Sequence, residues 1–213
     1  MIDTDADLRN FLLHDTGFDF PPSTVDEIMR LYPDDPAQGI PLNTGNERFA
    51  GLGYQYKRAA AIMGDVFYHA TRLSDARQYS RYSPTYVYRF NSRPFENSTN
   101  ATYTDVTGSL APASEGVKHF SEVQYVFNNP QFVGPWPQHK ALSEQMSAQW
   151  ITFAATGDPN GEGLPQWPKY DEGENGLNLV LQKENQGGNY VEEDTYRLAG
   201  RDYLTKWARR RHV

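Results

Sequence analysis

Apolar residues recur along the chain with two different periods, which predict helices and strands in alternation. Helical spacing runs through residues 54–76, where small and aliphatic side chains share one face. The same spacing returns at residues 142–153, and Gly157 followed by Pro159 marks the end of that helix. Residues 86–90 are β-branched or aromatic and lie between turn-forming residues, which is typical of a strand. The pattern therefore predicts an α/β protein.

Shorter segments complete the prediction. A helix is expected from Ser23, as its N-cap, to Pro33, and a Pro-, Gly- and Asp-rich loop follows it. The turn-rich residues 91–118 read as a long surface connection. Two elements are expected later in the chain, a strand at residues 178–182 and a helix at residues 201–210. No internal repeat and no clear linker divides residues 1–213.

Composition excludes several classes of protein. The 213 residues carry a net charge of -7, so a protein that binds nucleic acid along its phosphates is disfavoured, and the basic run at residues 209–211 reads as a solvated helix end. A hydrophobic fraction of 38% is sufficient for a folded core. No stretch reaches the roughly 18 apolar residues of a membrane span. Cysteine is absent, which excludes disulfides, thiolate nucleophiles and cysteine-bound zinc.

Two features concern the compartment of the protein. The N-terminal residues are acidic and polar, without the apolar stretch of a signal peptide. Two glycosylation sequons nevertheless stand almost side by side, at Asn97 and Asn100. We therefore expect a parent protein that is secreted and glycosylated, of which this chain is a part.

Candidate chemistry is sparse. None of the five histidines has His-x-x-x-His or His-Glu-x-x-His spacing, so no metal site is expected. The glycine pairs lack the pattern of a phosphate-binding loop, and no cofactor is expected. His119 stands apart because it lies where a loop leads into an apolar and aromatic segment, a place from which an imidazole can exchange protons with a substrate. From the residues alone, a surface or structural histidine is the commoner case.

Three blocks of residues, in order, resemble the type-B carboxylesterase family, which also contains cholinesterases and fungal lipases. Residues 116–127 read Gly-x-x-His-x-x-Glu-x-x-Tyr-Val-Phe, like the histidine loop of that family. Residues 150–160 read Trp-x-x-Phe-Ala-x-Thr-Gly-Asp-Pro-Asn, and residues 167–170 read Trp-Pro-x-Tyr, like the segments that follow the loop. The aromatic-rich, cysteine-free composition is similar to that of secreted fungal members.

The resemblance implies the C-terminal portion of an α/β-hydrolase fold, with an incomplete central sheet and packed helices. It implies that His119 is the histidine of a serine esterase triad, with Glu122 as a supporting residue. The nucleophile motif Gly-x-Ser-x-Gly is absent, because no serine has a glycine two positions before it. The acid motif Asp-Glu-Gly-Thr is also absent before His119. Residues 171–174 resemble it but follow the histidine, so we interpret them as a polar turn.

These observations favour a serine carboxylic-ester hydrolase whose nucleophile and acid lie outside residues 1–213, so that the chain alone is inactive. The resemblance implies a small-molecule or lipid ester as substrate. Two alternatives stay open: a non-catalytic binding or adhesion relative, and a remnant without function.

Asp65 is the last candidate. It lies within the long helical segment, where an unpaired carboxylate would be costly to bury. One interpretation points it to solvent. The other places it near the His119 loop as a supporting acid, distinct from the missing triad acid.

Overall fold

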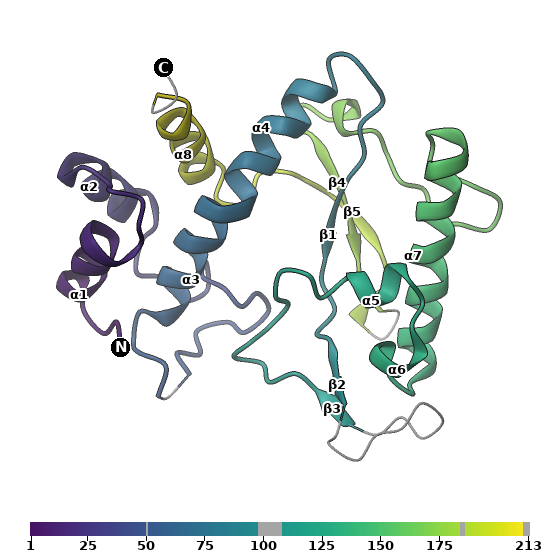
Figure 1. Cartoon of the computed structure of the whole chain (residues 1–213), viewed down its shortest axis with the longest axis horizontal. Coiled ribbons are helices and arrows are strands. Elements are labelled where there is room, and N and C mark those ends of the chain that lie inside the picture. Colours follow the sequence, from purple (N-terminus) through teal and green to yellow (C-terminus); the bar gives the residue numbers. More distant parts are fainter. Residues whose placement is uncertain (50, 98–107, 184–185, 211–213) are drawn as a thin grey trace. The chain divides into compact units, whose positions relative to one another are not determined.

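The computed structural model describes residues 1–49, 51–97, 108–183 and 186–210 (Figure 1). The chain forms two compact units. The first unit comprises Met1–Asp75 and Thr195–Val213, and the second comprises Ala76–Asp194. The boundary at Asp75 falls inside helix α4 (Ala70–Tyr79). No loop marks that boundary, which explains why the composition shows no linker there.

The first unit is helical. Its other elements are α1 (Asp5–Asn10), η1 (Phe11–Asp15), α2 (Pro22–Leu31), α3 (Tyr56–Gly64), η2 (Asp65–His69) and α8 (Leu198–Arg210). A capping box between Thr4 and Asp7 begins α1, and Asp5 and Asp7 lie in its first turn, where the helix dipole favours negative charge. The expected N-cap of α2 is wrong. Pro22 takes the first helical position, for which its fixed φ is suited, and Ser23 lies inside the helix.

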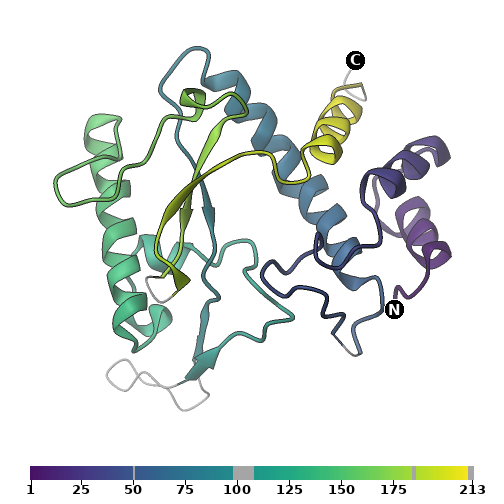
Figure 2. The same ribbon diagram turned by 180° about the vertical axis from the view of Figure 1, so that it is seen from behind.

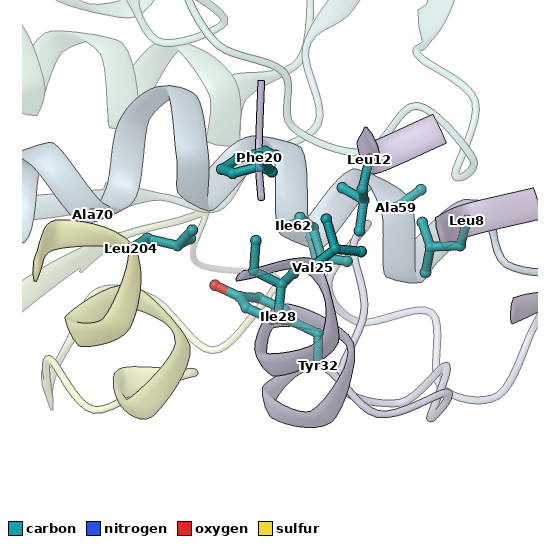
Figure 3. Packing of buried hydrophobic residues seen from close by; sticks show 11 residues of the cluster. Leu8, Leu12, Phe20, Val25, Ile28, Tyr32, Ala59, Ile62, Ala70 and Leu204 are labelled. Atoms are coloured by element: carbon teal, nitrogen blue, oxygen red, sulfur yellow. The ribbon is translucent and has the colours of Figure 1, made fainter. Parts of the chain in front are cut away.

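The core of the first unit joins these helices through aliphatic and aromatic side chains (Figure 3). Leu8 and Leu12 come from the N-terminal helical segment, Val25 and Ile28 from α2, and Ile62 from α3; all five are fully buried. The i, i+3 and i, i+4 spacing of these pairs is that of a helix with one apolar face. The predicted helix at residues 54–76 is confirmed as the continuous run of α3, η2 and α4.

The second unit contains the sheets. Its elements after α4 are β1 (Val87–Phe90), β2 (Phe95–Asn97), β3 (Gly108–Leu110), α5 (Val123–Val126), α6 (Pro130–Val133), α7 (Pro137–Thr156), η3 (Tyr170–Glu172), β4 (Leu177–Leu181) and β5 (Tyr190–Glu193). The larger sheet has the order β1-β4-β5, with β1 parallel and β5 antiparallel to β4. Figures 1 and 2 show α7 running beside this sheet, with α5 and α6 at its N-terminal half.

Aromatic side chains join α7 to the sheet. Tyr86, Tyr88 and Phe90 alternate along the β1 segment and pack against the buried cluster to which Met146 of α7 contributes. Trp167 is buried in the same cluster, and its indole Nε1 donates a hydrogen bond to the carbonyl of Val87 at 3.0 Å. The tryptophan of the third family block, residues 167–170, therefore helps to hold the sheet against its helix.

Most predicted elements of this unit are confirmed, including the strands at β1 and β4. Gly157 ends α7 in the left-handed conformation, with φ of 78°. The interpretation of residues 91–118 as connection alone is wrong, because β2 and β3 pair there as an antiparallel ribbon. The short strand β5 was also not expected. None of the helices in the described ranges has both the length and the apolar character needed to cross a membrane.

Candidate active site

His119 lies in a turn that leads directly into α5, and its side chain is exposed. The sequence predicted a loop that leads into an apolar and aromatic segment, and the structure has a turn there, which follows β1, β2 and β3 along the chain. The imidazole contacts the ring of Phe120 edge to face, with centroids 6.0 Å apart. The match to the family's histidine loop also predicts that the imidazole faces an open concavity, and this stays a prediction.

The backbone of Phe120, the residue after His119, is strained. Its φ of 76° lies in the left-handed region, which a bulky non-glycine residue rarely adopts. Two hydrogen bonds hold the turn: the amide of Ser121 donates to the carbonyl of Lys118 at 3.1 Å, and the amide of Val123 donates to that of Phe120 at 3.4 Å. Such strain persists only where the surrounding structure fixes the backbone, so the turn needs firm support.

Glu122 connects this turn to the sheet. The hydroxyl of Tyr88, on β1, donates a hydrogen bond to Oε1 of Glu122 at 3.3 Å. Burial, together with the nearby carboxylate, raises the pKa of Tyr88, so its proton is firmly retained as a donor. The carboxylate thus ties the segment before α5 to β1. A supporting role for Glu122 toward the imidazole of His119 stays a prediction.

A network of buried polar groups links α5 to α7 and to the segment after β4. Tyr125, at the centre of α5, is fully buried, and its hydroxyl lies 2.7 Å from Nδ1 of His139 on α7. Nε2 of His139 lies 3.2 Å from Nζ of Lys183, which follows β4. Ser143 of α7 donates to the carbonyl of Tyr125 at 2.8 Å. We call these four residues the His139 network.

This network carries no clear signal in the sequence. His139 was one histidine among five, and its position in the first turn of a helix gave no chemical signal. Tyr125 belonged to the family motif, but only as an aromatic position. The signal that could have drawn attention is the lysine directly after the apolar strand of residues 178–182, because lysine is rarely buried without a partner.

Asp65 belongs to the first unit, where it is fully buried. Arg197 donates two hydrogen bonds to its carboxylate, at 2.7 and 2.6 Å, and the hydroxyl of Tyr32 donates a third at 2.9 Å. The interpretation that points Asp65 to solvent is therefore wrong, because the carboxylate has a charged partner inside the core. A supporting role toward the His119 loop stays a prediction.

The remaining sequence candidates are placed only in part. Asn97 is the last residue of β2, and Asn100 lies outside the described residues. No group of three or more histidine, aspartate or glutamate side chains within the described ranges is arranged to hold a metal ion.

The second unit also has a hollow of about 150 Å³ between β1 and α7. Its walls are mainly aromatic, formed by Tyr86, Tyr88, Trp150, Phe153 and Trp167. An apolar hollow of this size can accept a few carbon atoms.

Comparison with known proteins decides the family. The model of the "Carboxylesterase family" matches residues 50–198, which is more than half of the chain. The chain belongs to the carboxylesterase family. It is 38% identical over 129 residues to carboxylesterase 5A of Mus musculus, an alignment that covers 55% of this chain and 20% of that protein. It is 37% identical over 120 residues to liver carboxylesterase of Sus scrofa, over 55% and 19% of the two chains.

Solved structures extend the likeness beyond the aligned sequence. The Aspergillus niger EstA structure matches with a TM-score of 0.68 at 18% identity, covering 99% of this chain and 37% of that one. A PNB esterase matches with a TM-score of 0.59 at 21% identity, over 96% and 34% of the two chains. These matches establish the fold of this carboxylesterase-family chain as part of an α/β-hydrolase fold. The chain spans about a fifth of the length of its carboxylesterase relatives.

Two neutral histidines, the buried His139 and the half-buried His69, should make this carboxylesterase-family chain sensitive to acid. Burial, the adjacent Lys183 and the hydrogen bond to Val133 together set the pKa of His139 at about 4, against 6.5 for a free imidazole. Burial likewise lowers the pKa of His69 to about 4 in the first unit. Between pH 4 and pH 6.5 the unfolded state binds more protons than the folded state. The stabilisation from the neutral histidines is therefore complete above pH 6.5 and is lost as the pH falls toward 4.

We expect the urea midpoint of unfolding to fall steadily from pH 7 to pH 4. A variant carrying His69→Gln and His139→Gln should lose part of that slope, because glutamine does not titrate. An unchanged slope in the double variant would contradict the assignment of these histidines.

Proposed function

We propose that this chain is the histidine-bearing C-terminal part of a serine carboxylic-ester hydrolase, of the carboxylesterase or lipase type. The observation that supports it most is the match of residues 116–127 to the family's histidine loop, together with the position of His119 in the turn before α5. His119 would take the proton of a serine hydroxyl and return it to the leaving alcohol. The substrate would be a small-molecule or lipid ester, without a cofactor or nucleic acid.

The serine and the acid of the triad would come from sequence outside these 213 residues. The chain holds neither Gly-x-Ser-x-Gly nor, before His119, Asp-Glu-Gly-Thr. In the α/β-hydrolase order, both precede the histidine. The chain alone would therefore lack the nucleophile and stay inactive, even with the His119 turn correctly folded.

The absence of the nucleophile motif also favours two alternatives to the hydrolase. One is a non-catalytic binding or adhesion relative, and the other is a remnant of an esterase gene. The transcript upstream of the Met1 codon separates these. An open frame with Gly-x-Ser-x-Gly and Asp-Glu-Gly-Thr supports the hydrolase. An open frame in which the serine is replaced supports the binding relative, and in-frame stop codons support the remnant.

We further propose that the parent protein is secreted and glycosylated at Asn97, Asn100 or both. The support is the pair of adjacent sequons, of which Asn97 ends strand β2. Two glycans three residues apart would crowd each other, so glycosylation at one of the two sites is enough to support the proposal.

When the chain is expressed behind a signal peptide in a glycosylating host, we expect an electrophoretic mobility shift that a glycosidase removes. The double variant Asn97→Gln, Asn100→Gln should migrate like the enzyme-treated chain. Identical mobility before and after treatment would count against secretion.

A further inference from the structure

The four residues of the His139 network come from three separate segments of the second unit. Tyr125 comes from α5, His139 and Ser143 come from α7, and Lys183 follows β4. All four side chains belong to buried residues. Nδ1 of His139 also lies 3.1 Å from the carbonyl of Val133, at the end of α6. One imidazole thus contacts α5, α6 and the segment after β4 at once.

The hydrogen bonds of this imidazole select one arrangement of protons. A charged lysine can only donate, so Nε2 of His139 must accept from Lys183 with its lone pair. The ring proton then lies on Nδ1, where the carbonyl of Val133 and the hydroxyl oxygen of Tyr125 are both within reach. Lys183 makes no ion pair within the described ranges. The hydrogen bond from its ammonium group to Nε2 holds the neutral imidazole in this tautomer.

Tyr125 transmits this constraint to the histidine turn. Helix α5 has only four residues and cannot be stable by itself. Its central tyrosine is held at both ends, by His139 at the hydroxyl and by Ser143 at the backbone carbonyl. The amide of Tyr125 donates in turn to the carbonyl of Glu122 at 2.9 Å, three residues from His119. The network therefore supplies the support that the strained backbone at Phe120 requires.

We propose that His139 is a positioning residue, which acts through Tyr125 to fix α5 and the backbone conformation of the His119 turn. Lys183 acts with it by fixing the tautomer of the imidazole. The catalytic use of this positioning rests on the proposed function, whereas the structural coupling between His139 and His119 does not.

The test is nuclear magnetic resonance of the full 213-residue chain at neutral pH, with histidine side chains and backbone amides labelled. Two variants interrupt the network, His139→Leu and the milder Tyr125→Phe, which removes only the hydroxyl. Lys140→Met is the matched control, because Lys140 is the exposed neighbour of His139 on α7. His139→Gln is the conservative variant, since an amide can still accept from Lys183 and donate to a carbonyl.

We expect His139→Leu and Tyr125→Phe to shift the imidazole resonances of His119. Both should also raise amide hydrogen exchange of residues 121–127 by about tenfold, the effect of one lost buried hydrogen bond. Exchange in the C-terminal half of α7 and in β4 should change much less. Lys140→Met should leave all of these unchanged, and His139→Gln should lie close to the unsubstituted chain.

Two results would overturn the proposal. One is an unchanged His119 signal and unchanged exchange at residues 121–127 in Tyr125→Phe. The other is a uniform rise of exchange over the whole second unit, which would mark His139 as a core residue without a specific link to the turn. Because no readout uses ester hydrolysis, an upstream sequence that lacks the nucleophile would remove the proposed function and leave this result standing.

Discussion

Incubated with a short-chain nitrophenyl ester, the purified 213-residue chain should release nitrophenol no faster than buffer does. The reason is chemical. An ester hydrolase of this family needs an activated serine, and no serine here lies in a Gly-x-Ser-x-Gly turn. Losing the nucleophile of a triad costs roughly six orders of magnitude in rate. A positioned histidine cannot replace it.

His119→Ala is the necessary companion variant, and it should be as inactive as the unsubstituted chain. Turnover by the chain that disappears in His119→Ala would contradict the proposal that the nucleophile lies elsewhere. A serine-directed fluorophosphonate gives a second readout, and we expect no labelled residue.

Arg197→Met should destabilise the first unit by about 3–5 kcal/mol, because it leaves a fully buried carboxylate without its cation. Arg197 donates two hydrogen bonds to Asp65 from the residue before α8, where its φ of 48° is itself strained. The same ion pair therefore holds the start of α8 in place. Methionine keeps much of the volume, so the loss reports on charge more than on packing.

Urea unfolding at pH 7, followed by circular dichroism, measures this effect. Asp75→Asn is the matched control, since Asp75 is exposed near the end of the helical run that contains Asp65, and it should change stability by less than about 0.5 kcal/mol. The double variant Asp65→Leu, Arg197→Met should cost less than Arg197→Met alone, because no charge is then left unpaired. Equal stability of Arg197→Met and the unsubstituted chain would show that the pair is not buried in solution.

The sequence predicted those elements whose apolar pattern is long and regular. The run of residues 54–76 and helix α7 carry repeated apolar faces with clear ends, and both are confirmed. β2 and β3 were missed because each has three residues, too few for an alternating pattern to stand out. Ser23 was misassigned as a cap because two prolines precede it, and either the serine or a proline can begin a helix.

The sequence predicts the candidate site only where the functional residues lie close together along the chain. His119 and Glu122 lie three residues apart, and a short motif can carry both. The partners of Asp65 and His139 could not be found in this way. Arg197 is 132 positions from Asp65, and Lys183 is 44 positions from His139. Such pairs arise when the chain folds back on itself, and no local period records them.

His119, we propose, is the general base of a serine esterase of which this chain is one part. The most direct measurement is the kcat/KM for a short-chain nitrophenyl ester of the chain joined to its upstream sequence, with and without His119→Ala. We expect the unsubstituted protein to be active and His119→Ala to lose roughly a thousandfold or more, with an unchanged urea midpoint. A His119→Ala protein that keeps its activity would show that His119 is not the general base.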